Sequence, residues 1–160
     1  MDESKRMGRK KKVALPATGD AFAFPLEDGR FCVCRVLSES VNRDEPKFAA
    51  VLVVCSAWIG SEVPAVDDPE LRPILKLTHH SWANKDEIGW IDDPLPDTFI
   101  PIGKILPTDE EASRECLTFS SWGSIQIQPM MQWRWDHERD AVLAEDAAKK
   151  EQQANLTAQN

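Results

Sequence analysis

The sequence predicts a small, mainly β domain of the α+β class, in which an antiparallel, partly barrel-like sheet is followed by one C-terminal helix. Three observations support this prediction: a hairpin pattern near the N-terminus, a long apolar run at 47–58, and a C-terminal stretch rich in Ala, Glu, Lys and Gln. A chain of 160 residues has the length of a single domain. We expect residues 13–150 to form that domain, with a disordered basic arm at 1–12 and a frayed tail at 151–160.

Two extended runs, residues 20–26 and 31–37, flank an Asp28-Gly29 pair. Asp-Gly suits the positive φ angles of tight hairpin turns, and the β-branched and aromatic flanks favour strands. Residues 47–58 are apolar at successive positions, as in a central strand that is covered on both faces. This run is therefore predicted to pair with the hairpin and to form the middle of the core.

The second half of the chain is predicted to alternate turns with shorter elements. Residues 59–72, with two Pro and several acids, are expected to form a surface loop with one turn at 68–71. Pro129 is expected to begin the C-terminal helix, which continues through Ala147 and frays beyond about Gln152. The elements predicted between these two segments are strands at 74–82, 87–91 and 98–105, a helix that Thr108 caps and that ends near Glu115, and weaker strands at 116–119 and 124–128.

Charge and hydropathy exclude several function classes. The chain carries −8 in all and residues 1–12 carry +4, which leaves −12 for the rest. A body this acidic repels phosphate backbones, so we predict no nucleic-acid binding. The longest apolar run, Phe48–Cys55, is too short to span a bilayer, and no signal-peptide core follows the basic N-terminus, so we predict no membrane partner and a cytoplasmic location. The four Cys suit packing in a reducing compartment, the pair Cys32 and Cys34 included, rather than disulfides or a soft-metal site.

A metal site would have to draw on three histidines, His79, His80 and His137. His79 and His80 are adjacent on an expected strand, so their side chains should point to opposite faces and one of them can reach a given ion. Asp136 and His137 can add a carboxylate and an imidazole for a divalent metal such as zinc, with Asp92 or Asp93 completing the set. In the alternative interpretation, these histidines are ordinary core or surface residues.

The chain has six Trp and no Tyr. The Trp residues fall at predicted strand ends, in loops and at the start of the last helix, where they suit either a pocket for a neutral aromatic ligand or the anchor of a protein interface. In the alternative, they join the helix to the sheet. Two acidic runs, at 62–70 and 86–97, are either solvated loops or a negative surface that docks onto a basic protein.

Residues 19–31, followed by Arg35-Val36-Leu37, resemble the opening signature of the immunity protein 26 group. Residues 77–82 and 132–137 resemble a branch of that group that is named together with a small phosphotriesterase. These stretches frame roughly residues 13–150. The resemblance implies a mostly β domain and two functions, hydrolysis of organophosphate triesters or neutralisation of a partner toxin in bacteria.

The first function that we predict is a small hydrolase acting on neutral organophosphate triesters. In it, His79 or His80, Asp136 and His137 are the metal ligands, Trp82, Trp133 and Trp135 line an apolar substrate pocket, and no catalytic residue is assigned. A metal-bound hydroxide is sufficient for an activated aryl triester, but three His cannot build a His-rich two-metal cage. The alternative is an immunity protein that binds a basic protein toxin.

Overall fold

The computed structural model describes residues 15–40 and 49–159, and the expected disordered arm at 1–12 lies outside them. The hairpin is confirmed: β1 (Asp20–Pro25) pairs antiparallel with β2 (Phe31–Ser40). Gly29, with φ +88°, lies in the connecting turn, as the Asp-Gly pair predicts. β3 (Ala50–Gly60) pairs with the other edge of β2, so the long apolar run is confirmed as a strand of the core.

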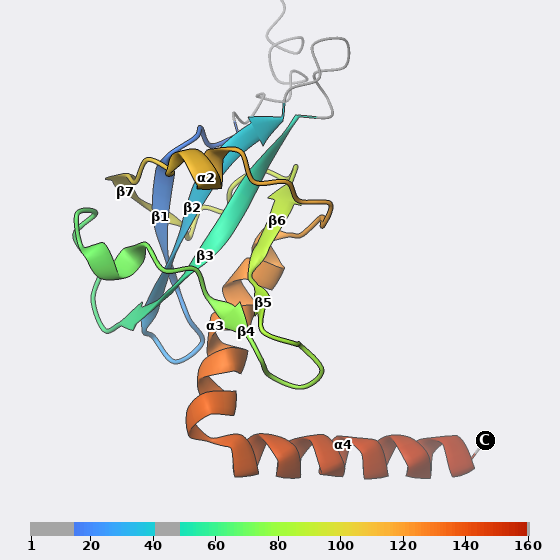
Figure 1. Cartoon of the computed structure of the whole chain (residues 1–160). Coiled ribbons are helices and arrows are strands. Elements are labelled where there is room, and N and C mark those ends of the chain that lie inside the picture. The colour runs from blue at the N-terminus through green and yellow to red at the C-terminus, as the bar shows by residue number, and fades with distance from the viewer. Residues whose placement is uncertain (1–14, 41–48, 160) are drawn as a thin grey trace, which may run out of the picture.

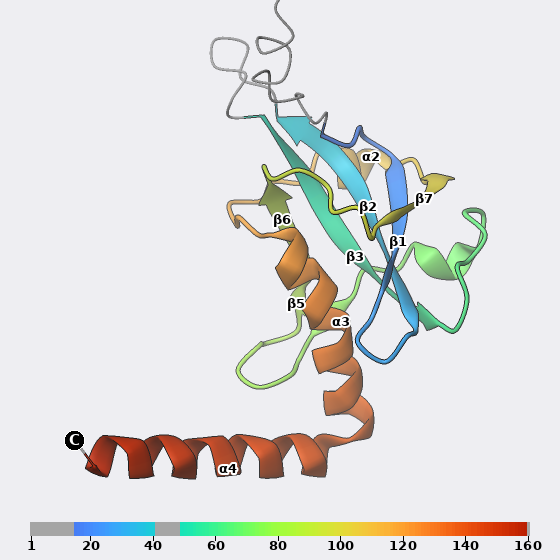
Figure 2. The ribbon, with the colours of Figure 1, turned by 180° about the vertical axis from the view of Figure 1, so that it is seen from behind.

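The sheet has five antiparallel strands in the order β6-β3-β2-β1-β7, in which β6 is Ile88–Ile91 and β7 is Ile100–Lys104 (Figure 1). It is not closed, which corrects the expected partial barrel: β6 and β7 remain opposite edges with three strands between them. The physical reason lies in the C-terminal part of the chain. In a closed barrel, the strands themselves cover the inner face of the sheet. Here α3 covers one face of the sheet instead, as Figure 2 shows, so the sheet does not need to close.

The two faces of the sheet form separate cores because successive side chains of a strand point to opposite sides. One face packs Phe22, Phe24, Val53 and other β residues against Trp122 and Ile125 of α3. Cys32, Cys34 and Cys55 are free thiols buried on this same face, so the prediction that they pack as small apolar residues is confirmed. The opposite face carries two smaller apolar clusters. On β2, Val33 belongs to one cluster and Leu37 to the other, and Arg35 lies between them on the same face.

The strand expected at 74–82 is much shorter in the structure. Ile74 makes an isolated bridge to Ser56, and β4 spans Lys76–Leu77, paired with β5 (Lys85–Asp86) in a small separate sheet. Beyond Leu77 the chain turns, with His80 at φ +57° and Asn84 at φ +55°. Left-handed backbone at His80 is incompatible with a continuous strand, which is why the predicted alternation of His79 and His80 does not occur.

The expected single C-terminal helix is two helices, α3 (Trp122–His137) and α4 (Arg139–Ala158). Pro129 lies inside α3 rather than at its start, because Ser121, eight residues earlier, caps the helix by accepting a hydrogen bond from the Ser124 amide. The weak strand expected at 124–128 is therefore wrong. Glu138, at φ −134°, separates the helices, and α4 continues to Ala158, past the fraying expected beyond Gln152.

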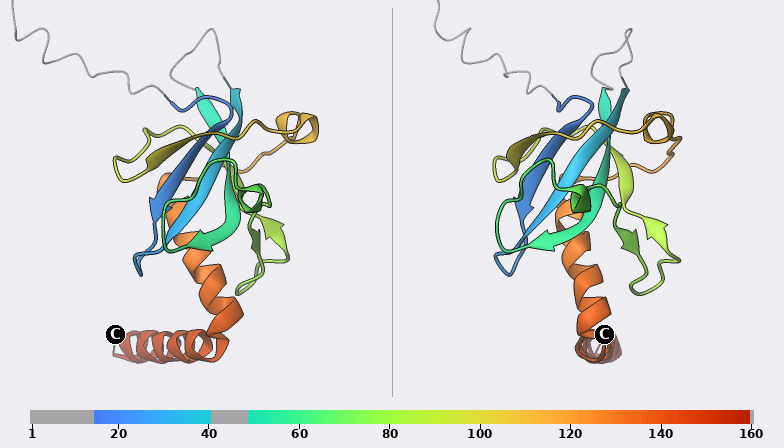
Figure 3. Two further views of the ribbon diagram at one scale, coloured as in Figure 1. Left: turned by 90° about the vertical axis from the view of Figure 1, so that its left-hand side faces the viewer. Right: turned by 60° about the vertical axis from the view of Figure 1, so that its left-hand side comes forward.

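Figures 1 and 3 show that α4 turns away from α3 and extends beyond the sheet. Val142 is its one buried residue among those described.

The shorter elements agree better with expectation. The turn at 68–71 contains a 3-10 helix, η2 (Pro69–Leu71), and Thr108 caps α2 (Asp109–Ala112) in a complete capping box with Glu111. Within the described ranges no helix has both the length and the apolar composition of a membrane span.

Candidate functional site

The turn after β4 brings the two adjacent histidines together. The Nδ1 atoms of His79 and His80 lie 2.7 Å apart, and the rings meet edge to face. The prediction that they point to opposite faces of a strand is wrong, because the left-handed backbone at His80 rotates its side chain back towards His79. The two imidazoles therefore act as one polar unit.

This unit is held from both C-terminal helices. His79 is 2% exposed, and its Nε2 lies 2.7 Å from Oε1 of Gln128 on α3. On the other side, Nε2 of His80 lies 2.8 Å from a carboxylate oxygen of Asp146 on α4. A chain of hydrogen bonds therefore runs from Gln128 through His79 and His80 to Asp146. All four ring nitrogens of the two histidines have partners within the protein.

The other expected metal ligands lie apart from that unit. Asp136 accepts a hydrogen bond from the Gln132 side chain, whose own oxygen accepts from the amides of Thr78 and His79. Asp136 is therefore connected to the histidine turn indirectly, through Gln132. The Nδ1 atom of His137 lies 2.8 Å from the Trp133 carbonyl oxygen, and its ring stacks on Trp133 with 4.5 Å between centroids. Among residues 15–40 and 49–159, no group of three or more His, Cys, Asp or Glu side chains is arranged to hold a metal ion.

The three Trp residues expected to line one pocket belong to different surroundings. Trp135 is the one that reaches the histidines, with its ring 5.1 Å from that of His80. Trp133 is covered by the Arg30 guanidinium at 4.1 Å and by His137 on the same helix. Trp82 is 39% exposed, with the Lys85 ammonium 4.8 Å from its ring centroid. Of the other Trp residues, Trp122 is buried in the core beside Phe99.

A cavity of about 480 Å³ lies between the end of β1, α3 and α4, and we call it the His80 cavity. Leu26, Ile127 and Met130 supply apolar lining, while His80 and Asp146 supply polar groups. Its volume falls within the range of small-molecule sites. Sequence reasoning had no signal for Asp146 or Gln128, because each becomes relevant only when its helix is placed beside the turn.

A second cavity, of about 140 Å³, lies between the turn that precedes β6, segment 118–120 and α3, and we call it the Glu87 cavity. Trp82, Phe119, Glu87 and Gln128 all line it. Glu87 is 6% exposed, and this burial raises the pKa of its carboxyl to about 7 although the positive charge of Lys85 acts in the opposite direction. A buried carboxyl with a raised pKa at the wall of a cavity is a functional-site signature.

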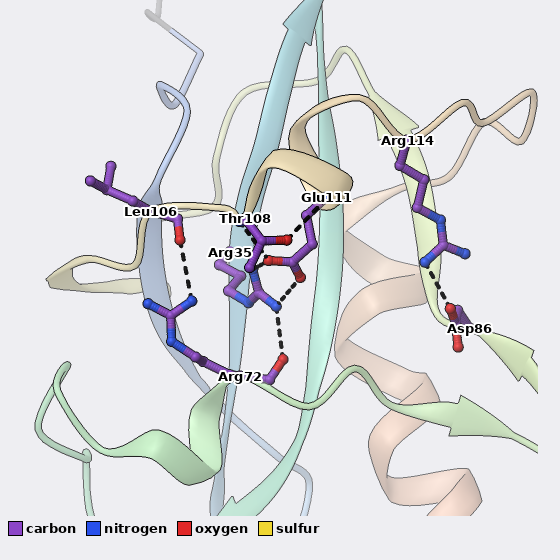
Figure 4. Close-up of polar contacts among 7 residues, drawn as sticks. All are labelled: Arg35, Arg72, Asp86, Leu106, Thr108, Glu111 and Arg114. Atoms are coloured by element: carbon purple, nitrogen blue, oxygen red, sulfur yellow. Dashed lines mark hydrogen bonds and ion pairs between the residues drawn. The ribbon is translucent and has the colours of Figure 1, made fainter.

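The segment that borders the Glu87 cavity is anchored by ion pairs (Figure 4). Arg35, 1% exposed on β2, donates hydrogen bonds to both carboxylate oxygens of Glu111 and to the Arg72 carbonyl. Burial by itself raises the pKa of Glu111, but the hydrogen bonds from Arg35 and from the Thr108 amide hold that pKa below its usual value. Arg114 pairs with Asp86 of β5 at 2.7 Å. These contacts fix α2 and the chain that follows it against the sheet.

Gln128 lines the Glu87 cavity and hydrogen-bonds to His79, whose ring in turn contacts His80 at the wall of the other cavity. The arrangement can hold ligands through apolar walls, one histidine–carboxylate pair and one buried acid. Comparisons with protein-family models, with curated proteins and with solved structures find no match to this chain.

Proposed function

We propose that the protein acts by stoichiometric binding, as a bacterial immunity protein that neutralises a basic partner toxin. The observation that carries the proposal is exposed aromatic surface on a strongly acidic protein. Trp82 and Phe119 are 39% and 73% exposed around the buried Glu87, and the chain outside the N-terminal arm carries a net charge of −12. Exposed aromatic residues beside a desolvated charge are typical of the energetic centre of an interface.

Binding is favoured over metal-assisted hydrolysis by the state of the histidines. Both ring nitrogens of His79 and both of His80 are hydrogen-bonded to protein groups, and His137 lies against Trp133. A metal ion would have to displace Gln128 or Asp146 from these nitrogens before it could bind. The residues expected to hold zinc do not fit a metal site in this arrangement, so we derive no step through a metal.

Hydrolysis of neutral organophosphate triesters is the second candidate. One observation favours it: the His80 cavity has the volume of a small-molecule site, and its wall combines apolar side chains with the His80–Asp146 pair. A neutral aryl triester suits such a wall. The Asp146 carboxylate, which accepts the hydrogen bond from His80, can also orient a water molecule in this cavity. The free cysteines agree with action in the reducing cytoplasm in either case.

The test of the binding proposal uses the full chain and a basic toxin encoded beside its gene. We expect a complex of one to one stoichiometry by calorimetry and rescue of growth when the two proteins are expressed together. A neighbouring toxin that neither binds nor is neutralised contradicts the proposal.

The test of the hydrolase uses a chromogenic aryl phosphotriester, with and without a chelator. Under the binding proposal, the wild-type protein hydrolyses the phosphotriester no faster than the combined variant His79→Ala, His80→Ala, His137→Ala does. Turnover that the triple variant loses supports the hydrolase instead, and sensitivity to the chelator would then implicate a metal.

A further inference from the structure

The Glu87 cavity is too small for a drug-sized molecule and has the size of one side chain. Its volume is about 140 Å³, whereas small-molecule sites run from ~300 to ~1,000 Å³. Its walls come from three parts of the chain: Trp82 and Glu87 on either side of β5, segment 118–120 beside β6, and α3. Such a cavity suits an anchor residue that projects from another protein.

Glu87 gives this cavity a carboxylate without a close partner. Among the described residues, no side chain donates a hydrogen bond to the Glu87 carboxylate, although the residue is 6% exposed. The neighbouring acid Asp86 is already paired with Lys76 and Arg114. Lys85 attracts Glu87 through its charge but does not hydrogen-bond to it. A buried carboxylate of this kind is stabilised strongly by a cation that enters beside it.

Two exposed aromatic side chains border the cavity. Trp82 and Phe119 line the cavity and are exposed, and Leu117, two residues before Phe119, is 98% exposed. The Trp82 ring already faces a cation, the Lys85 ammonium. Aromatic faces bind cations more strongly when water is excluded, and an apolar border provides that exclusion.

The cavity also offers hydroxyl oxygens as hydrogen-bond acceptors beside the carboxylate. Ser120 and Ser124 line it, and hydroxyl oxygens accept hydrogen bonds from charged donors. Arginine presents five N–H donors in a plane, stacks on aromatic rings and is less strongly hydrated than lysine. A carboxylate, hydroxyl oxygens and an aromatic face together match a guanidinium better than an ammonium.

We propose that the Glu87 cavity binds an arginine side chain of the basic partner, with the guanidinium against Trp82 and paired with the Glu87 carboxylate. This inference rests on the proposed binding function and names the partner chemistry at its centre. On binding, Lys85 moves off the Trp82 ring, and the incoming cation lowers the pKa of Glu87.

The experiment uses the full chain and N-acetyl-arginine amide as the probe. N-acetyl-citrulline amide, which has the same shape without the charge, is the matched probe control. Binding is followed by NMR at constant ionic strength through the Trp82 indole N–H and the Glu87 amide. We expect the arginine probe to shift both signals with saturation and the citrulline probe to shift neither.

Two variants and one control assign the binding to the cavity. Glu87→Gln keeps the side-chain shape and removes the charge, and we expect it to weaken probe binding at least about tenfold, as loss of a charged hydrogen bond does. Trp82→Ala, at an exposed position, should weaken it as well, with saturation then followed at the Glu87 amide. Glu62→Gln removes an exposed carboxylate elsewhere and should bind as the wild type does. The NMR spectra of the variants show directly that each is folded.

Equal affinity for the arginine and citrulline probes, or unchanged affinity of Glu87→Gln, overturns the inference. Tighter binding of N-acetyl-lysine amide than of the arginine probe overturns the arginine assignment. The probe results are independent of the toxin test. If the protein neutralises its toxin but does not bind the probe, the proposed function stands and the arginine site is overturned. If it binds the probe but no toxin, the arginine site stands and the proposed function is overturned.

Discussion

Glu87 is the side chain whose chemistry depends most on its surroundings. In the sequence it is one acid in a run of acidic residues, but in the structure it is buried beside Gln128 while its neighbour Asp86 forms two ion pairs. Burial disfavours the charged form, so the pKa of Glu87 rises to about 7, whereas the hydrogen bonds from Lys76 and Arg114 hold the pKa of Asp86 below its usual value against the opposing effect of burial. The pKa values of these two adjacent carboxyls are thus shifted in opposite directions.

The raised pKa of Glu87 predicts that the folded protein loses stability as the pH rises. Between about pH 4.5 and pH 7 the unfolded chain releases this proton and the folded protein retains it, so the free energy of unfolding falls by about 2–3 kcal/mol over that window. Glu87→Gln should remove this fall. Urea denaturation of the wild type and of Glu87→Gln at pH 5 and pH 8 measures the difference, and Glu62→Gln serves as the exposed control. Parallel pH dependence of the wild type and Glu87→Gln would contradict the prediction.

At the scale of elements, α2 is a four-residue helix that depends on one buried ion pair for its position. Its residues are all exposed or half-buried, and Glu111 connects it to Arg35 in the middle of the sheet. Arg35 is buried with its Nε atom lacking a hydrogen-bond partner among the described residues, so the charge depends on Glu111 and on the Arg72 carbonyl. The ion pair positions the loop on either side of α2 (Figure 4).

Glu111→Ala should therefore destabilise the protein strongly, by about 3–5 kcal/mol, because it leaves the Arg35 charge buried and unpaired. Glu110→Ala in the same helix turn removes an exposed carboxylate and should cost less than about 0.5 kcal/mol. Both values follow from chemical denaturation at pH 7. Equal losses for the two variants would show that the pair does not hold α2.

Elements differ in how far the sequence predicts them. The hairpin, β3 and the Thr108 cap follow from local signals, which are turn chemistry, apolar runs and capping spacing. Local signals do not predict the turn at His79 and His80. They also do not predict that α3 starts before Pro129. A two-residue β4 has too few contacts for local propensity to decide its end, and Ser121 competes with Pro129 as the helix start. α3 places Trp122, Ile125, Pro129 and Gln132 against the body at helical spacing, so packing decides its limits.

At the scale of the whole molecule, charge determines which partners can approach. The net charge of −12 outside the N-terminal arm gives the molecule a long-range attraction for basic proteins, while the Glu87 cavity supplies a local contact for one side chain. Long-range attraction acts on the rate of encounter. Contacts made after docking act on the rate of dissociation.

The rate of association with a basic toxin should therefore fall with salt. Raising the ionic strength from ~0.01 M to ~0.15 M shortens the Debye length from ~30 Å to ~8 Å, and we expect an association rate at least about tenfold lower. The dissociation rate should change much less in the same stopped-flow series. An association rate that is independent of salt would contradict electrostatic attraction as the source of recognition.

The sequence by itself determined the β-rich class, the hairpin, the central strand, the buried thiols and the acidic balance, because each depends on neighbouring residues or on composition. Only the tertiary structure decided that the sheet stays open, that His79 and His80 form one unit with Gln128 and Asp146, and that Glu87 is buried in a cavity. These features join residues about 30 to 70 positions apart in the chain. Their relative placement follows from the packing of α3 and α4, for which no local pattern exists.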